Sequence, residues 1–475
     1  MRLASLILLI LIFRTNLHAL VLNLKQAEEI ALQENKPYLI AFEDVYQADM
    51  RRKQAISEWL PKITYSALYA HTPQVMAVVH IPEGTNSFTH DFVINRFDLV
   101  QPLLSTNLLY GLKSKKLQLQ NSEAEKEDTK NHLLLKIRKD YFSVVLYDAA
   151  LDIQKENINY LTEALEVNQG KFQNGDFTIL ELNQSRVAVS NALSEYYTTL
   201  QRLKEARNSL VYTLGVDPIV EEQLSLEDHD IKVEKIEEIK QKLEVLERKY
   251  NYFTDQFAAT FDLILQSERV RNERKLTLFS HEEVDNYLDT AYENRPDLRS
   301  KRLQIDIAQK EVETKYGDYV PQITGFVGYV KNGGLPQDRF VIADDMSLSV
   351  GVKLSWNLFD GFLRENKIKE AVSKRRSSSI DYSYARDNVE ITVRNQLHQI
   401  EDALYVYISG MEGVRLAEMA MVQAKEKLRF GKIPPLEYRD TVNQLAKARN
   451  IRNFSSYQLM IAYYQLMFDI GDDSQ

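Results

Sequence analysis

The chain has 475 residues, a net charge of -9 and no cysteine, which excludes disulfides, thiolate nucleophiles, cysteine-ligated metals and lipid attachment through an N-terminal cysteine. With 44% hydrophobic and 27% charged residues, the composition is that of a folded protein, neither disordered nor a multi-span helical membrane protein. The negative charge gives no reason to expect nucleic acid as a partner, because phosphate binding depends on clustered lysine and arginine.

The N-terminus predicts a secretory signal. Met1 and Arg2 precede an apolar run over residues 3–13, which is shorter than the roughly 20 residues that a membrane-spanning helix needs. We expect cleavage after Ala19, so that residues 1–19 are a signal peptide, and a retained N-terminal anchor is the alternative. No later segment approaches the length of a spanning helix, so any part of the mature chain within a membrane has to be β-structure.

Long stretches without proline predict long helices. Proline is absent from residues 103–217 and 337–433, and the first of these stretches contains glycine-free runs over 112–169 and 176–214. Both runs carry apolar residues at helical spacing, which favours packing of helix against helix.

Segments of alternating polarity precede the helical stretches. The clearest is the predicted strand 346–359, and looser alternation predicts strands at about 62–72, 90–103 and 322–331. One apolar face and one small, polar face suit a transmembrane strand of about 10 residues, although a half-buried strand of a soluble sheet alternates in the same way. The residues predicted to face lipid are Met346, Leu348, Val350, Val352, Leu354, Trp356 and Leu358.

Four pairs of segments indicate an internal duplication. The pairs are ENKPYL (34–39) with ENRPDL (293–298), LPKIT (60–64) with VPQIT (320–324), QPLL (101–104) with WNLF (356–359), and FQNGDFTILEL (172–182) with LRFGKIPPLEY (428–438). Their offsets stay between 255 and 260 residues, and such constant spacing is the signature of a repeated unit.

The duplication divides the mature chain into three parts. We expect a first repeat over 20–213, a charged helical insert over 214–280 and a second repeat over 281–475. Each repeat is predicted to contain short helices, two strands and a long helical hairpin, with the hairpin tips near 170–178 and 428–436. Four strands cannot close on themselves in lipid without open edges, so several copies are expected to complete the sheet together.

These features resemble the TolC-like outer membrane efflux proteins. The resemblance rests on the order of elements, the doubled E-N-x-P and P-x-I-T segments, the strand ending in SWNLFDG (355–361) and two G-x5-E turns. It implies a mainly α fold with a small β part, in which a trimer forms a 12-stranded β-barrel in the outer membrane above a periplasmic α-helical barrel.

The resemblance also implies a function. The chain would be the passive exit duct of a tripartite export system for efflux or secretion, including type I secretion. Its partners would be two sister copies, a periplasmic adaptor (membrane fusion) protein, an inner-membrane transporter and outer membrane lipid, and no cofactor is implied. Drugs, metal ions and proteins are all compatible cargoes.

The two hairpin tips carry candidate site residues. Gly175 and Gly431 suit helix C-termini, and Thr178 with Glu181 matches a capping box. The resemblance implies that an adaptor docks on the tips, and the residues concerned are Gly175, Thr178, Glu181, Gly431, Pro434 and Pro435.

Two acids follow the second tip glycine. Glu437 and Asp440 match positions that are acidic in the similar family, which implies a gate of carboxylates around the periplasmic mouth of a trimer. Such a ring focuses a negative field and favours cations. The family latches this mouth with an aromatic residue and a base, where the present chain has Leu428 and Ile433.

Other classes of function find less support. The chain contains no G-x-S-x-G, H-E-x-x-H, G-x4-G-K-[ST] or G-x-G-x-x-G motif, and its eight histidines are scattered, so we expect no catalytic residues and no metal site. A secreted or periplasmic coiled-coil structural or adhesion protein without a membrane barrel is the alternative. That class would explain the long helices but not the paired strands.

Overall fold

The computed structural model describes residues 20–72, 90–217, 224–226, 239–241, 244, 278–334 and 346–472. The chain divides into two compact units: unit 1 is Met1–Ala41, Lys126–Pro296 and Arg386–Gln475, and unit 2 is Phe42–Glu125 and Asp297–Ala385. The predicted signal peptide and most of the predicted insert lie outside the described residues.

The elements repeat in the same order along the chain. The first set is β1 (Leu20–Leu22), α2 (Leu24–Glu34), α3 (Lys36–Ser57), β2 (Lys62–Thr72), β3 (His90–Leu104), α4 (Thr106–Gln173) and α5 (Ile179–Leu214). The second set is β4 (Leu224–Leu226), α8 (His281–Asn294), α9 (Pro296–Gly317), β5 (Gln322–Gly334), β6 (Met346–Ser355), α10 (Leu363–Arg429) and α11 (Pro435–Ile470). This arrangement confirms the predicted mainly α fold with a small β part. Among the described helices, none is both long and apolar enough to cross a membrane.

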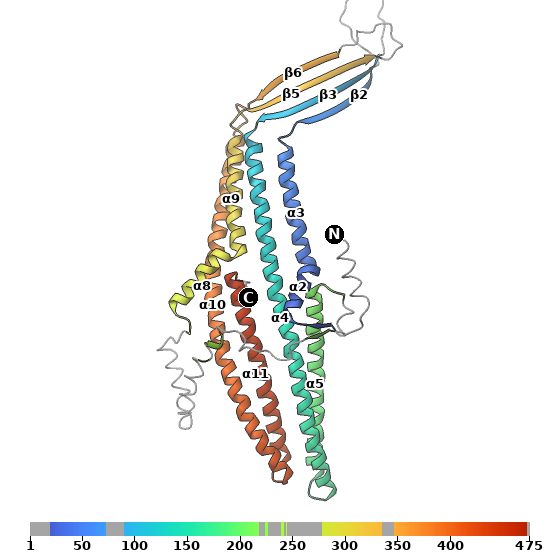
Figure 1. The fold of residues 1–475 in the computed structure, drawn as a ribbon, viewed down its shortest axis with the longest axis vertical. Coiled ribbons are helices and arrows are strands. Elements are labelled where there is room, and N and C mark those ends of the chain that lie inside the picture. Colours follow the sequence, from blue (N-terminus) through green and yellow to red (C-terminus); the bar gives the residue numbers. More distant parts are fainter. Residues whose placement is uncertain are drawn as a thin grey trace, which may run out of the picture. The chain divides into compact units, whose positions relative to one another are not determined.

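Unit 2 contains one antiparallel sheet of four strands in the order β2-β3-β5-β6 (Figure 1). The register aligns Tyr65 with Phe97, Phe97 with Tyr329, and Tyr329 with Leu348. The ring centroids of Tyr65 and Phe97 are 4.6 Å apart. Because side chains alternate between faces along a strand, these four residues form one apolar row across the sheet.

The opposite face of the sheet is polar. The adjacent row consists of Thr64, Asp98, Gly328 and Ser349. Arg96, which points to the same face as Asp98, forms an ion pair with it at 2.7 Å. The sheet is therefore amphipathic across all four strands, and β2 and β6 are its edges.

In unit 1, the two repeats hold their short helices against the long hairpins in the same way. Asn35 lies between α2 and α3, and its Nδ2 donates to the carbonyl oxygen of Thr213 near the end of α5 at 2.8 Å. Arg295 lies between α8 and α9, and its Nη1 donates to the carbonyl oxygen of Asp469 near the end of α11, also at 2.8 Å. Both bonds tie a break between two short helices to the last turn of a hairpin.

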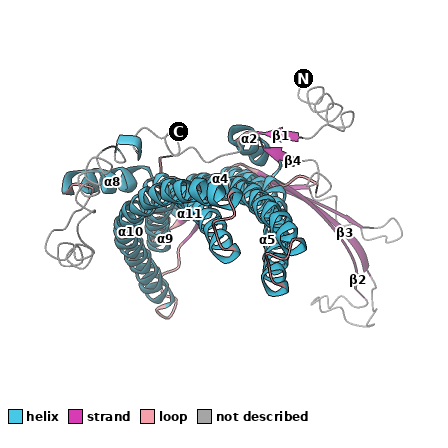
Figure 2. Ribbon diagram, turned by 90° about the horizontal axis from the view of Figure 1, so that it is seen from below, coloured by secondary structure: helices cyan, strands magenta, loops and turns pink. Residues whose placement is uncertain are grey.

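The hairpins α4–α5 and α10–α11 pack side by side within unit 1 and form a curved layer in Figure 2. Phe142 of α4 stacks on Tyr464 of α11 with ring centroids 5.8 Å apart. In the second hairpin, the buried Gln396 Nε2 donates to the carbonyl oxygen of Ala462 at 2.8 Å. The apolar stripe predicted for the first run is buried in α4, as at Ile137 and Val144, whereas Val187 and Leu193 of the stripe predicted for α5 are 57% and 40% exposed.

Candidate functional site

Both hairpin tips begin with the same backbone turn. In the first tip, Gly175 N–H donates to Phe172 O at 3.1 Å, and Asp176 N–H donates to Lys171 O at 2.9 Å. In the second tip, the corresponding bonds join Gly431 to Leu428 and Lys432 to Lys427 at 3.0 and 2.8 Å. Each glycine is left-handed, with φ of 83° and 67°, which makes both turns Schellman motifs that satisfy the final carbonyl groups of the helix.

The first tip is closed by its own side chains. Thr178 is the N-cap of α5, and its backbone N–H and hydroxyl both donate to Glu181 Oε2 at 2.8 Å. Glu181 N–H donates back to Thr178 Oγ1, which completes the capping box predicted from the sequence. The hydrogen bonds from Thr178 lower the pKa of Glu181, so this exposed carboxylate is ionised and engaged within its own turn.

The second tip lacks this cap. Pro434 occupies the N-cap position of α11, where it offers neither a backbone N–H nor a polar side chain, and no side-chain cap bond forms. Glu437 stands where Glu181 stands in the first hairpin, but it has no reciprocal partner at the N-cap. Its side chain is exposed. Asp440 is also exposed and accepts from Arg439 Nη2 at 2.8 Å. Of the two predicted gate acids, only Asp440 has a cationic neighbour at ion-pair distance in the described part of the chain.

Leu428 and Ile433, at the predicted latch positions, are core residues of unit 1. They are 4% and 5% exposed and belong to a cluster that joins the two tips. That cluster consists of Leu161, Ala164, Ala188, Ala192, Met421, Ala424, Leu428, Ile433, Tyr438, Val442 and Leu445. Apolar packing between the hairpins thus occupies the places where the resemblance implies an aromatic residue and a base.

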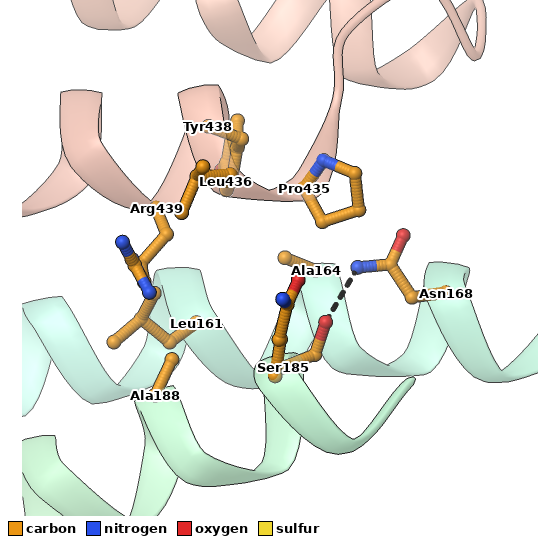
Figure 3. Close-up of a pocket in the computed structure, with 10 residues that line it drawn as sticks. Leu161, Ala164, Asn168, Ser185, Ala188, Pro435, Leu436, Tyr438 and Arg439 are labelled. Atoms are coloured by element: carbon orange, nitrogen blue, oxygen red, sulfur yellow. Dashed lines mark hydrogen bonds between the residues drawn. The ribbon is translucent and has the colours of Figure 1, made fainter. Parts of the chain in front are cut away.

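A small cleft lies between the tips (Figure 3). Pro435, Leu436 and Arg439 of α11 line one side, and the first hairpin supplies the other, where Asn168 Nδ2 donates to Ser185 Oγ at 3.0 Å. The remaining lining residues are Leu161, Ala164, Gln184, Ala188 and Tyr438. The cleft brings Pro435, one of the predicted tip residues, against the first hairpin.

Tyr438 is the most enclosed polar side chain at this cleft. It is 1% exposed, and its hydroxyl has no hydrogen-bond partner among the described residues. Burial raises the pKa of Tyr438 to about 12, and the nearby Glu163 and Tyr160 act in the same direction. No sequence pattern marks Tyr438, because an aromatic residue at helical spacing is indistinguishable from an ordinary core residue.

A charged network joins the hairpins further from the tips. Arg449 of α11 pairs with Glu156 of α4, and it donates to Glu418 of α10 at 3.0 Å. Glu156 also accepts a hydrogen bond from the Tyr160 hydroxyl at 2.6 Å. This bond is the main cause that raises the pKa of Tyr160, and burial is the second. Lys425 and Glu163 form a further ion pair at 3.3 Å. No sequence motif marks these residues, since single charges on long helices are normally solvated.

The predicted lipid-facing residues occupy the edge strand β6 and the corner after it. Leu348, Val350, Val352 and Leu354 are each at least 61% exposed and lie on the apolar face of the sheet. Met346 is the first residue of the strand. The strand ends at Ser355, before the predicted end at residue 359, because Trp356 Nε1 donates to the carbonyl oxygen of Tyr319 at 3.0 Å and the chain then turns into α10. Trp356 and Leu358 therefore belong to the corner and remain exposed.

Comparison with known protein families gives a match that covers most of both repeats. A family model described as outer membrane efflux protein matches residues 27–216 and 287–472. A search of curated protein sequences finds no significant match.

Several solved outer membrane proteins share this fold. The CmeC outer membrane channel of Campylobacter jejuni has a TM-score of 0.75 at 15% identity, over 95% of this chain and 87% of that chain. The outer membrane protein VceC of Vibrio cholerae gives 0.72 at 13% identity, over 94% and 96%. The MtrE outer membrane channel of Neisseria gonorrhoeae, in its open state, gives 0.67 at 13% identity, over 95% and 90%.

Proposed function

Because the chain belongs to the outer membrane efflux protein family, we propose that it is the exit duct of a tripartite export system and that three copies close one pore. The protein is located in the outer membrane, with its helices in the periplasm, as members of this family are. The family is one of channels, which favours this function over the secreted coiled-coil alternative and over an enzyme.

The observation that supports closure by several copies is the open, amphipathic sheet of unit 2. Its apolar face suits lipid, but β2 and β6 each pair on one side only among the described strands. Unsatisfied N–H and C=O groups on such edges cost several kcal/mol each in hydrocarbon. Pairing β6 of one copy with β2 of the next removes every edge, and three copies of four strands give twelve strands, an even number as in bacterial barrels.

The duplication predicts the register of this pairing. Within one chain, β3 of the first repeat pairs with β5 of the second, and Val100 lies opposite Phe326. With the repeat offset of 255, the position in the second repeat that is equivalent to Val100 is Ser355. With the offset of 260, the position in the first repeat that is equivalent to Phe326 is Ser66. If the contact between copies repeats the contact between repeats, Ser355 of one copy lies opposite Ser66 of the next. Both serines are exposed in the single chain.

Thiol cross-linking tests both the register and the number of copies. The natural chain contains no cysteine, so Ser66→Cys with Ser355→Cys introduces the only two thiols. We expect oxidation, or a short bifunctional thiol reagent, to give covalent dimers and trimers and no larger species on denaturing gels. The control Ser66→Cys with Ser349→Cys is six residues out of register, about 20 Å along the strand, and is expected to stay uncross-linked. A ladder that ends at four chains, or equal cross-linking of the control, would contradict the proposal.

The exposed tips are the proposed docking surface for a periplasmic adaptor, which in turn engages an inner-membrane transporter. Apolar side chains at both tips support this assignment, because Leu180, Phe430 and Leu436 are at least half exposed. Large exposed apolar side chains are typical of surfaces that meet a protein partner. Leu180→Asp with Phe430→Asp is expected to abolish co-purification with the adaptor while leaving the detergent-solubilised oligomer intact. Unchanged co-purification would move the docking surface away from the tips.

The same proposal assigns a gate to the second tip. Glu437, with no cap to satisfy, and Asp440 would surround the periplasmic entrance in each of the three copies. The exposure of both carboxylates supports this assignment, and their charge would favour passage of cations.

A further inference from the structure

The polar face of the sheet in unit 2 carries more positive than negative charge. Among the side chains that the structure describes, the charged residues of this face are Lys62 of β2, Arg96 and Asp98 of β3, and Lys353 of β6. Arg96 and Asp98 form an ion pair at 2.7 Å and offset each other. Three bases against one acid leave a net charge of +2 on this face of each chain.

The two remaining lysines are open to solvent. Lys62 and Lys353 are exposed, and neither forms an ion pair within the described part of the chain. In the row of the sheet that contains Lys62, the partners are Val100, Phe326 and Gly351, none of which is charged. The positive charge of both ammonium groups therefore acts on any solute beside this face.

The duplicated fold does not require lysine at either position. With the repeat offset of 260, the position equivalent to Lys62 is Gln322, and with the offset of 255 the position equivalent to Lys353 is Asp98. Both equivalent residues lie in strands of the same sheet. An amide and an acid serve at these places of the repeated unit, so strand formation alone does not explain the lysines.

An aromatic ring lies on the same face near Lys353. Phe326 pairs with Gly351, and a Cβ at position 351 would lie 2.8 Å from Phe326 Cζ and 3.0 Å from its Cε1. The ring therefore covers the backbone of β6 at a place that glycine leaves free. Lys353 follows two residues later on the same face, about 7 Å along the strand. The polar face thus combines apolar surface with an exposed ammonium group.

Resting on the proposed function, in which the polar face lines the lumen, we propose that this wall binds organic anions. The ligand class is a carboxylate, sulfonate or phosphate attached to an apolar body. Lys62 and Lys353 of each copy attract the anionic group, because rings of lysine or arginine favour anions in pores and a low-dielectric wall focuses their field. Phe326 contacts the apolar body. The barrel end of the duct therefore selects the charge opposite to that favoured by the proposed gate.

Ion selectivity of single channels tests the charge of the wall. For full-length protein reconstituted into planar bilayers, the reversal potential in a potassium chloride gradient measures the preference for chloride over potassium. We expect Lys62→Gln with Lys353→Gln to shift this potential toward potassium. Lys331→Gln is the matched control, because Lys331 is an exposed lysine of the same sheet that lies on the apolar face, two residues after Tyr329. This control should leave the reversal potential unchanged.

Two divalent anions of different character test the role of the ring. Naphthalenedisulfonate and sulfate carry the same charge, but only the first has an apolar body. We expect naphthalenedisulfonate to block single-channel current at a lower concentration than sulfate. The double lysine variant should raise both blocking concentrations by about tenfold or more. Phe326→Gln should remove the difference between the two anions while leaving block by sulfate in place, and the heat-stable oligomer in unboiled gels verifies that each variant assembles.

The outcomes separate this proposal from the proposed function. Absence of channels from the unaltered protein would overturn the duct itself. Normal channels with an unchanged reversal potential in the double lysine variant would overturn the anion-binding wall and leave the duct standing. An equal shift in Lys331→Gln would overturn it as well, because the effect would not belong to the polar face. Equal block by both anions in the unaltered protein would contradict the organic class of ligand.

Discussion

The two hairpins carry glutamates at equivalent positions, and a difference in the N-cap residue gives these glutamates different hydrogen bonding. Glu181 and Glu437 occupy the same position in their hairpins, but Thr178 engages the first while Pro434 cannot engage the second. The charge of Asp440 is partly offset by its ion pair with Arg439. At the residue scale, Glu437 is therefore the carboxylate with most freedom to act on ions.

This difference predicts an asymmetric effect on channel block. Glu437→Ala together with Asp440→Ala should abolish block of single-channel current by a trivalent cation. Glu437→Gln alone should raise the blocking concentration by about tenfold, which corresponds to roughly 1.4 kcal/mol of lost attraction. Asp440→Asn alone should have a smaller effect, because Arg439 already offsets that charge. Unchanged block in the double variant would place the constriction elsewhere.

The buried hydroxyl of Tyr438 predicts a pH effect on stability. Its folded pKa is about 12, above the ordinary value of 10.0, so the folded state holds the proton more tightly than the unfolded state. The corresponding stability is fully present below pH 10 and is lost as the pH rises toward 12. Tyr438→Phe should therefore show a shallower fall in thermal stability over this window than the unaltered protein. Identical slopes would contradict the burial of this hydroxyl in solution.

At the element scale, close packing makes one hairpin glycine more critical than another. Gly215 ends α5 with φ of 78°, and a Cβ there would lie 2.5 Å from the carbonyl oxygen of Glu34. Gly175 has a similar φ of 83°, but a Cβ there would meet nothing within 4 Å. Substitutions at these two glycines therefore separate the free-energy cost of a left-handed backbone from the cost of a clash between Cβ and a neighbouring backbone atom.

We predict that Gly175→Ala lowers the free energy of unfolding by about 1 kcal/mol through conformation alone. Gly215→Ala should lower it by about 3 kcal/mol or more, since α2 must also move away from α5. Chemical unfolding of the detergent-solubilised protein measures both. Equal losses would argue that the junction of α2 and α3 adapts without strain.

The ion pairs of Arg449 predict how the hairpins are coupled. Arg449→Gln removes contacts from α11 to both α4 and α10, and partly exposed pairs of this kind contribute about 1 kcal/mol or less each. We expect faster amide exchange around both tips. Arg415→Gln is the matched control, because Arg415 pairs with Glu412 on its own helix and should leave the tips unchanged.

The same elements indicate how far sequence reasoning reached. Proline gaps predicted the long helices, because proline is excluded from helix interiors, and alternation predicted the strand at Met346. The capping box at Thr178 was also predictable, since it is local. Tyr438 and Arg449 were not, because their roles depend on partners in another helix, which no residue pattern encodes.

At the scale of the whole molecule, one chain supplies an incomplete sheet. The proposed trimer predicts a particle containing three chains in detergent, and multi-angle light scattering measures this number directly. The folded particle should resist dissociation in unboiled gels and should separate into single chains after boiling. A stable two-chain or four-chain particle would require eight or sixteen strands and would contradict the twelve-stranded arrangement.

The edges at which β2 and β6 pair with no other described strand also bear on how the protein reaches its destination. Until a newly exported copy meets another, its two open strand edges and the apolar face of its sheet lie in water. The risk of aggregation is therefore greatest before the protein becomes functional. In the proposed trimer, the encounter between copies is a step of maturation whose rate depends on the abundance of the chain. At low expression, unassembled copies would persist and be degraded by periplasmic proteases, whereas high expression would favour assembly of complete pores.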